Sequence, residues 1–429
     1  MLPKNKQFSN FSKAVQSKSQ CFRPDNEDQI ATLMTMPNEN GLLARGNGSS
    51  YSDCCLNDQG VVIDTSRFNH LLSFDEASGL LVCQGSVSFA DLFLVHPDYI
   101  PPVIPGTLRA TVAGGIANDV HGKNNHQQGS FGEHIEWIEL EIGNQSYRCD
   151  RKTNAYLYHA TIAGLGLTGF IKRIALKMRK ASHAVVASSA KYFAWEAVLE
   201  RMQTSGCDYD YQVAWLDLLN KPQALVTFAN HAEAGNLKPQ SQYKMPQIPM
   251  RFINTWTMKQ FNRFYFNHPR KKEVILSLPQ FNNPLDSIKN WTHLYGKNGL
   301  LQFQALFDQE QALSAIDELI KLIRSHQAIP TLAVLKYFTK TGSGLLSFAQ
   351  PGFTLAIDFV NNTQSRQAII AMNEWITRAG GKIYLAKDIL LSKDQFRQQY
   401  PKHEEFSNLL KRYQSTMCSD MSKRLGISQ

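Results

Sequence analysis

A histidine and a lysine stand two residues apart at His121-Gly122-Lys123, directly after a segment with three glycines, Gly106, Gly114 and Gly115. Glycine lets backbone N–H groups approach an anionic or planar ligand closely because it has no Cβ. Imidazole exchanges a proton near neutral pH, and an ammonium group stabilises a developing anion. The arrangement therefore predicts a ligand site with acid–base or electrostatic chemistry rather than a packed core.

A second glycine-bearing turn lies at residues 44–53 and includes Gly46, Gly48 and three serines. Such a turn supplies free N–H and hydroxyl donors, which are the groups that a pyrophosphate requires. Taken alone, the turn could equally be a plain surface loop. Together with residues 105–124 it favours a site for a dinucleotide.

A third glycine segment, residues 164–169, matches the GxGxxG pattern of dinucleotide-binding folds. That fingerprint needs a strand before it and a helix after it. Here residues 155–163 have a helical pattern and the residues that follow have a strand pattern. The order is reversed, so the sequence argues against a Rossmann fold.

The chain has 429 residues, of which 43% are hydrophobic and 19% charged, as in globular proteins of two or more domains. No apolar run reaches the roughly 18 residues of a membrane span, and the first 23 residues lack the apolar region of a secretory signal. The seven cysteines form no CxxC pair or metal-like cluster. We therefore expect reduced thiols, no metal site and a cytoplasmic location.

The net charge of +9 is concentrated in one segment. Residues 234–272 contain eight Lys and Arg, seven aromatic residues and no Asp or Glu. Basic and aromatic side chains together suit a surface that meets anionic lipid headgroups or a phosphorylated ligand, with a solvated loop or a nucleic-acid surface as alternatives. We expect peripheral contact with the inner face of a membrane through residues 238–272, and no nucleic acid partner.

Short strand-like runs dominate residues 24–180 and are cut by turn residues. The clearest lie at residues 61–64, 71–74, 80–83, 137–142 and 170–178, and residues 88–95 have the pattern of a serine-capped helix. Longer patterns follow from about residue 184, including an amphipathic helix at 310–326, and the chain is expected to end in a helix near 404–413. We predict a cofactor domain of residues 1–183, a substrate domain of residues 184–382 inserted into it, and a return to the cofactor domain at residues 383–429.

These motifs resemble the flavoenzymes related to vanillyl-alcohol oxidase and p-cresol methylhydroxylase (PCMH), and among them the decaprenylphosphoryl-β-D-ribose oxidases. The resemblance extends over nearly the whole chain and rests on Arg45-Gly46, Ser50-Tyr51, Pro105-Gly106-Thr107, His121-Gly122-Lys123-Asn124, Gly129-Ser130-Phe131-Gly132, Leu301-Gln302-Phe303-Gln304, Ala386-Lys387-Asp388 and Ser419-Asp420-Met421. It implies an α+β fold in which a two-part PCMH-type FAD-binding domain carries an inserted α+β substrate domain built on an antiparallel sheet.

The resemblance also implies a set of cofactor-binding residues. Some oxidases of the superfamily attach FAD covalently through a histidine where this chain has Ser49, so we expect FAD to be held without a covalent bond. The implied FAD contacts are Arg45, Gly46, Asn47, Gly48, Ser49, Ser50, Tyr51, Pro105, Gly106, Thr107, Thr111, Gly114, Gly115, Asn118, His121, Gly122, Lys123, Asn124, Gly166, Gly169, Ile171 and Lys387.

The implied chemistry is oxidation of a secondary alcohol, in which the hydroxyl proton is removed and a hydride passes to flavin N5. By resemblance, Tyr51 and His121 lie beside the flavin, and His121 is either the base or a hydrogen-bonded support for the ring. Lys387 is expected to stabilise charge on the reduced flavin and Lys336 to contact the substrate. Gln302 and Gln304 are expected to hold sugar hydroxyls.

Three positions depart from the family pattern on the substrate side: Ala356 replaces a cysteine, Thr354 an asparagine and Asn282 a tyrosine. Ala356 implies that no thiol is present for covalent inhibitors of the family. We hypothesise a polyprenyl-phosphate-linked pentose substrate of cell-envelope polysaccharide synthesis, oxidised at its 2′-hydroxyl as the first half of an epimerisation that a separate short-chain reductase completes. The alternatives are a soluble sugar, lactone or alditol oxidase that uses oxygen, and a flavin-binding partner protein without turnover.

Overall fold

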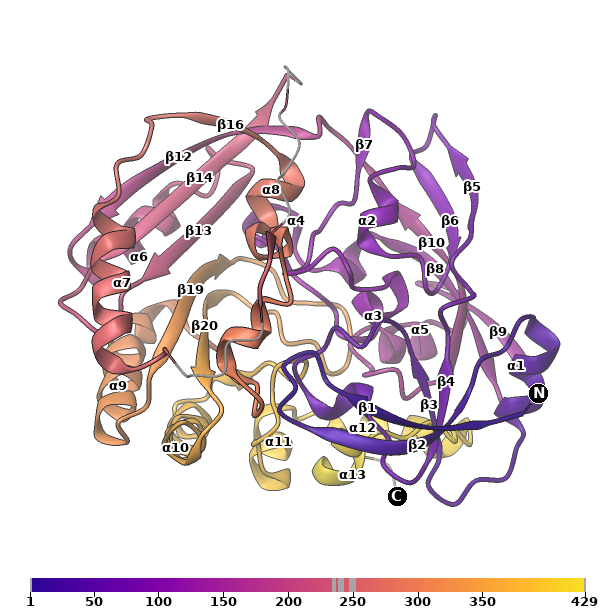
Figure 1. Ribbon diagram of the computed structural model, residues 1–429. Helices are drawn as coiled ribbons and strands as arrows, with labels where there is room; N and C mark the ends of the chain where they lie inside the picture. The colour runs from indigo at the N-terminus through magenta and orange to yellow at the C-terminus, as the bar shows by residue number, and fades with distance from the viewer. Residues whose placement is uncertain (1, 234–236, 238–242, 247–251, 428–429) are drawn as a thin grey trace.

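The computed structural model describes residues 2–233, 237, 243–246 and 252–427. Its N-terminal part contains a small four-stranded sheet with the order β1-β2-β4-β3 (Figure 1). Strands β2, β4 and β3 run parallel, so their carboxyl ends meet at one edge, where the first glycine turn leaves the sheet. The elements are β1 (Lys4–Ser9), β2 (Gln16–Phe22), α1 (Glu27–Met34), β3 (Leu42–Arg45) and β4 (Val61–Asp64).

The next part of the chain forms an antiparallel five-stranded sheet with the order β5-β6-β10-β8-β9. The strands expected at 61–64, 71–74, 80–83, 137–142 and 170–178 are confirmed to within two residues. The helix expected at 88–95 is confirmed but is shorter, and Ser88 caps it. The elements are β5 (Leu71–Asp75), β6 (Leu80–Gln84), α2 (Phe89–Leu92), α3 (Val112–Ala117), α4 (Asn125–Gln128), β8 (Ile135–Ile142), β9 (Gln145–Asp150), α5 (Ala155–Thr161) and β10 (Phe170–Lys177), with β7 (Tyr99–Ile100) paired to β11 (Arg179–Lys180).

An antiparallel eight-stranded sheet, order β16-β12-β14-β13-β19-β20-β18-β21, forms the other half of the molecule (Figure 1). It is built from residues 184–383, close to the range expected for a substrate domain; the division into domains itself stays a prediction. The strands are β12 (Ala184–Tyr192), β13 (Tyr211–Leu216), β14 (Ala224–Ala232), β16 (Val274–Ser277), β18 (Leu300–Phe307), β19 (Pro330–Phe338), β20 (Gly352–Val360) and β21 (Lys382–Ile383).

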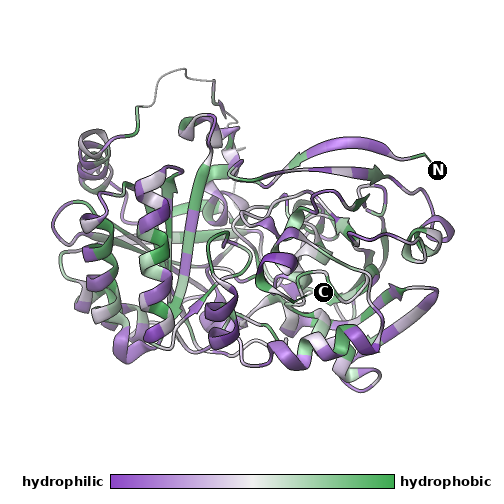
Figure 2. Ribbon diagram, turned by 90° about the horizontal axis from the view of Figure 1, so that it is seen from below, coloured by the Kyte–Doolittle hydropathy of each residue, from purple (hydrophilic) through white to green (hydrophobic). Residues whose placement is uncertain are grey.

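Three helices pack together against this sheet, namely α6 (Trp195–Thr204), α9 (Ala312–Ser325) and α10 (Thr363–Arg378). The expected amphipathic helix is α9, and its buried side chains include Ile316, Leu319 and Ile323. Figure 2 shows how hydrophobic and hydrophilic residues alternate along the helices that flank the green strands. Because these helices pack on the apolar side chains of one face of the sheet, the opposite face is available for polar groups.

The remaining elements connect the halves or close the chain. They are β15 (Tyr243–Lys244), α7 (Thr255–Asn267), α8 (Leu278–Asn282), β17 (Ile288–Lys289), α11 (Lys393–Gln399), α12 (His403–Arg412) and α13 (Asp420–Leu425). The expected final helix is α12, but the prediction that the chain ends there is wrong, because α13 follows. Helix α13 has only six residues, too few for a periodic pattern, and is defined by a Ser419–Ser422 capping box and by Gly426 in the left-handed region. No helix among the described residues is long and apolar enough to cross a membrane.

Candidate active site

One face of the eight-stranded sheet carries a row of polar side chains. Strand register places Gln302 opposite Asp358 and Gln304 opposite Ala356 on β18 and β20, and Lys336 of β19 opposite Thr354. Side chains alternate between the faces of a strand, so these positions share one face, and the intervening Leu355, Ile357 and Phe359 lie in the apolar core. The sheet therefore brings together both glutamines and Lys336, as the sequence predicts, together with two of the three departures, Thr354 and Ala356.

His121 meets this face from the second glycine segment. The Gln304 side-chain amide lies 2.9 Å from His121 Nε2 and donates to Thr354 Oγ1 at 3.1 Å. Rings of Phe338 and Tyr384, each 4.9 Å away between centroids, surround the imidazole. Burial, followed by the nearby lysines, holds the pKa of His121 well below its usual range, so the ring is neutral.

Lys387 lies in a turn that follows β21, residues 384–388, where its backbone N–H donates to the Tyr384 carbonyl at 3.0 Å. Its ammonium sits 3.7 Å from the centre of the Tyr51 ring, a cation–π contact. The Ser50 hydroxyl donates to the Ala386 carbonyl at 2.8 Å. The first glycine turn and the Lys387 turn are thus fixed to each other.

Lys123 extends toward α8. Its ammonium donates to the Phe281 carbonyl at 2.5 Å and lies 4.4 Å from the centre of the Phe281 ring. The neighbouring Asn283 amide donates to the Pro105 carbonyl at 2.7 Å, which fixes the start of the second glycine segment. Asn282, the third departure from the family pattern, is buried on the same helix.

Positive charge dominates the site. The side chains of Lys123, Lys336 and Lys387 are half-buried, and burial lowers the pKa of each ammonium group. Burial and the charge of Lys336 lower the pKa of Lys123 to about 7, and burial lowers the pKa of Lys336 to about 8. Burial also lowers the pKa of Lys387. The charge of Asp358 raises this pKa, and the charge of Lys336 lowers it further.

The first and second glycine segments meet directly. A Cβ on Gly46 would lie 2.6 Å from Thr111 Oγ1, so only glycine permits this approach. The Asn47 amide donates to the Arg109 carbonyl at 2.8 Å, and Thr111 caps α3 by accepting from the Gly114 N–H. The two segments therefore form one continuous surface, as a dinucleotide site requires.

The third glycine segment lies against the same helix. The Leu165 N–H donates to the Ala117 carbonyl at 2.7 Å, and Gly166 has open space where a Cβ would stand. Gly169 differs, because a Cβ there would lie 2.7 Å from the Glu141 carbonyl. Gly166 can therefore approach a ligand, whereas packing against β8 is sufficient to explain Gly169. The segment stands between helix α5 and strand β10, which confirms the reversed order that argues against a Rossmann fold.

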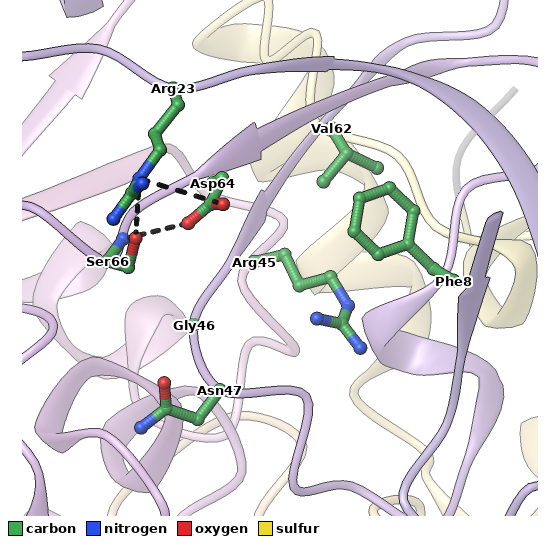
Figure 3. A pocket seen from close by; sticks show the side chains of 8 residues that line it. All are labelled: Phe8, Arg23, Arg45, Gly46, Asn47, Val62, Asp64 and Ser66. Atoms are coloured by element: carbon green, nitrogen blue, oxygen red, sulfur yellow. Dashed lines mark hydrogen bonds and ion pairs between the residues drawn. The ribbon is translucent and has the colours of Figure 1, made fainter. Parts of the chain in front are cut away.

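A cavity of about 340 Å³ opens on the first glycine turn (Figure 3). Arg45, Gly46 and Asn47 line it, together with residues at the ends of β2 and β4, and Phe8 of β1. These are the carboxyl ends of the three parallel strands, where ligands of open α/β sheets bind. Arg45 itself is held by the Cys55 and Ser9 carbonyls, at 3.1 and 3.0 Å.

Buried polar atoms around the glycine segments provide a test of whether this surface fits FAD. His121 Nδ1 and Asn282 Nδ2 are buried and have no hydrogen-bond partner among the described residues. Nothing lies within 4 Å of the position of a Cβ on Gly106. Unpaired buried donors are costly unless a ligand satisfies them. These residues therefore fit a planar cofactor with acceptor atoms, and they lie beside the sheet face that holds the glutamines.

Sequence reasoning gave no role to three residues at this site. Asp358 shares the polar face and is 2% exposed, and the period-two alternation of residues 352–360 could have placed it there. Tyr384 donates to the Asn118 carbonyl at 2.9 Å, and Arg424 binds both Asp53 and Asp388. No local pattern signals these long-range contacts.

Comparisons with known proteins agree with this geometry. Residues 19–144 match the family model of the FAD binding domain. The chain is 29% identical to the decaprenylphosphoryl-beta-D-ribose oxidase of Mycolicibacterium smegmatis, over 90% of this chain and 89% of that protein. It is 25% identical to an uncharacterized protein in the mprA 5′ region of Streptomyces coelicolor, over 76% of this chain and 95% of that protein.

A putative D-arabinono-1,4-lactone oxidase of Neurospora crassa is 24% identical over 55% of this chain and 42% of that protein. The family match covers the first glycine turn and the second glycine segment, which are the segments that meet at Gly46 and Thr111. Residues 19–144 are thus a PCMH-type FAD-binding domain, and the chain is an FAD-dependent oxidoreductase.

Proposed function

We propose that this protein oxidises a secondary alcohol of a phosphate-bearing sugar, a polyprenyl-phosphate-linked pentose, to a ketone at its 2′ carbon. FAD would be held, with no covalent link to the protein, between the two-part cofactor domain and the inserted substrate domain, and it would supply the hydride acceptor. A separate reductase would complete an epimerisation. The similarity to an oxidase whose name carries a decaprenylphosphoryl ribose supports this substrate class.

The observation that carries the proposal is the excess of positive charge at the site. Lys336 is close enough for its charge to act on both Lys123 and Lys387, and among the described residues Asp358 is the carboxylate that acts on Lys387. Clustered ammonium groups are costly to bury unless anions neutralise them. A phosphate on the substrate and the negative charge gained by FAD on reduction supply such anions, whereas a neutral sugar supplies none.

The polar face orients the pentose. Gln302 and Gln304 stand two residues apart on β18, and each presents an amide to the site. Thr354 and Ala356 are small, so the sheet beneath the substrate is shallow at these positions. We assign sugar hydroxyls to the glutamines and the phosphate to Lys336.

His121 acts as a support for the cofactor rather than as the base. The Gln304 amide nitrogen faces His121 Nε2, so Nε2 accepts and the ring proton resides on Nδ1. A neutral Nδ1–H with no partner is a donor for the cofactor. Its pKa, held low by burial and by two lysines, leaves it without the proton affinity that a base requires.

Helix α7 gives the proposed lipid-linked substrate a route to the protein. Its described exposed residues include Trp256, Phe264 and Arg263, whereas Phe266 anchors it against Trp215 and Leu225 of the sheet. Aromatic side chains beside lysines and arginines suit an interface with anionic lipid. Lys238 and Arg251, part of the basic segment noted in the sequence, lie outside the described residues. We assign peripheral contact with the inner face of a membrane to α7.

A lactone or sugar oxidase that uses oxygen is the second candidate, favoured by the similarity to a putative lactone oxidase. An anaerobic screen separates the two. The purified protein is mixed without oxygen with a prenyl-phosphate pentose, the free pentose or a sugar lactone, and the absorbance of the flavin is followed. We expect bleaching by the phosphate-linked pentose alone. Bleaching by the free sugar or the lactone at an equal rate would refute the proposal.

A further inference from the structure

The turn between β1 and β2, residues 10–15, contacts the site although the reaction just described does not use it. The hairpin, indigo in Figure 1, runs from the N-terminus toward the middle of the molecule. The Phe11 N–H donates to the Ser50 carbonyl at 2.9 Å, and the Asn10 side-chain amide donates to the Tyr51 carbonyl at 2.6 Å. Asn10 is buried, so this bond is shielded from water. The turn therefore fixes the backbone of the first glycine turn.

The same turn is bonded to the large sheet. The Ser12 carbonyl accepts at 3.0 Å from the N–H of Leu300, the first residue of β18. Gly299 has a φ of +69°, and a Cβ there would overlap the Ser12 carbonyl oxygen, so only glycine permits this approach. Residues 10–15 thus connect the first glycine turn to the strand that carries both glutamines of the site.

Phe11 places an aromatic ring against Tyr51. The centres of the two rings are 5.0 Å apart, and the Trp291 ring lies 6.0 Å from that of Phe11. These rings pack in one small apolar cluster with Leu300. Tyr51 also contacts the Lys387 ammonium, which lies 3.7 Å from the centre of its ring. A cation–π contact depends on where the ring lies, so the packing of Tyr51 determines where this ammonium is held.

We propose that Phe11 is a positioning residue: it fixes the Tyr51 ring and, through that ring, the Lys387 ammonium. The inference rests on the proposed function, in which the lysines of the site meet the negative charge of the reduced FAD. It adds that Lys387 depends on the N-terminal hairpin for this task. The polar bonds of Asn10 and Ser12 hold the turn by themselves, so loss of the Phe11 ring leaves the turn in place and gives Tyr51 room to move.

The midpoint potential of bound FAD tests this without any substrate. A cation beside the cofactor stabilises the negative charge gained on reduction and raises the potential. Burial lowers the pKa of Lys387, but a measurement at about pH 6 is acid enough to keep its ammonium protonated. In the Phe11→Ala holoenzyme we expect the equilibrium to shift against the reduced form by about three- to tenfold, the size of one aromatic contact. For a two-electron couple this is a fall of about 15 to 30 mV.

Double variants show which lysine the ring acts through. If Phe11 acts through Lys387, then Phe11→Ala adds nothing to Lys387→Met but adds its full effect to Lys336→Met and to Lys123→Met. Equal shifts in all three backgrounds would refute the inference and leave the role of Lys387 intact. If Lys387→Met keeps the native potential, the role of Lys387 fails, and the inference fails with it.

The single variants have matched controls. Phe11→Tyr retains the ring and should keep the native potential. Phe193→Ala removes a ring that is 67% exposed and should also leave the potential unmoved. A native potential in Phe11→Ala, or an equal fall in Phe193→Ala, would overturn the inference. If Phe11→Ala does not retain FAD, Phe11→Leu replaces it and should lower the potential by less; an unmoved potential there again overturns the inference.

Discussion

At the scale of single residues, one imidazole and three ammonium groups reach the same site from three separate parts of the chain. The Gln304 amide faces His121 Nε2, so the neutral imidazole accepts this hydrogen bond and adds no charge to the site. Tyr51 positions Lys387, because the centre of its ring lies 3.7 Å from the Lys387 ammonium. Removal of one such charged donor typically slows a reaction by about 10²- to 10³-fold.

Lys387→Met should accordingly slow anaerobic reduction of the flavin by about 10²- to 10³-fold, because the negative charge on the reduced cofactor loses its cation. Stopped-flow absorbance with the substrate found in the screen measures this rate, and the FAD content per chain checks that the cofactor is retained. Lys321→Met, at an exposed position of α9, is the matched control and should reduce at the native rate. Native reduction in Lys387→Met would refute the assignment.

The sequence predicted these residues unevenly. The glycine segments, with His121 and Lys123, could be found locally, because the residue types lie side by side in the chain. Lys387 and the two glutamines came from the family resemblance. Asp358 was missed because its hydrogen bond with Gln302 joins two strands that are distant in sequence, although strand alternation gives its face.

At the scale of elements, the C-terminal helix α13 ties the Lys387 turn to the first glycine turn. Arg424 donates to both oxygens of Asp53 at 2.9 Å and to Asp388 at 3.0 Å. Asp388 also accepts from the Leu390 and Leu391 N–H groups, at 2.8 and 2.7 Å. The family motif Ser419-Asp420-Met421 therefore has a structural reason, since it begins the helix that carries this arginine.

Arg424→Met should lower the free energy of unfolding by about 3 kcal/mol or more, because it leaves two buried carboxylates without their cation. Urea denaturation of the holoenzyme, followed by flavin fluorescence, measures the change. Arg378→Met replaces an exposed arginine at the end of α10 and should cost less than about 1 kcal/mol. Equal stability of the two variants would contradict the role given to Arg424.

The five strands predicted at 61–64, 71–74, 80–83, 137–142 and 170–178 were found because short apolar runs bounded by turn residues define them. Helix α13 could not be predicted, because six residues carry too little periodicity. The pairing of β18 with β20 could not be predicted either, because the register of distant strands depends on packing. The extra 3-10 turn before α9, Gln309–Gln311, shows the ordinary uncertainty at a helix end.

At the scale of the whole molecule, basic residues occur both inside the site and on helix α7. Helix α7 lies at the side of the large sheet, as Figure 1 shows, and its exposed residues include Trp256, Phe261 and Phe264. Phe261 and Tyr265 stack with ring centres 6.0 Å apart, and Tyr265 packs against Trp215. The sequence predicted the composition of this surface but not that a helix anchored by Phe266 would present it.

The double variant Lys259→Gln and Arg263→Gln should bind phosphatidylglycerol vesicles about 30-fold more weakly, since each basic residue near an anionic surface contributes roughly 1 kcal/mol. Sedimentation with vesicles measures binding, and phosphatidylcholine vesicles show how much depends on charge. Lys321→Gln with Lys411→Gln makes equal charge changes on α9 and α12. Unchanged sedimentation of the α7 variant would remove the membrane assignment.

The central claim is that the glycine segments hold one FAD against His121 and Lys387 without a covalent bond. The most direct measurement is the flavin content of the purified protein before and after denaturation. We predict a yellow protein with one FAD per chain, all of it in solution once the protein is precipitated by acid. A colourless protein that takes up no added FAD, or flavin that stays with the precipitated chain, would contradict the account.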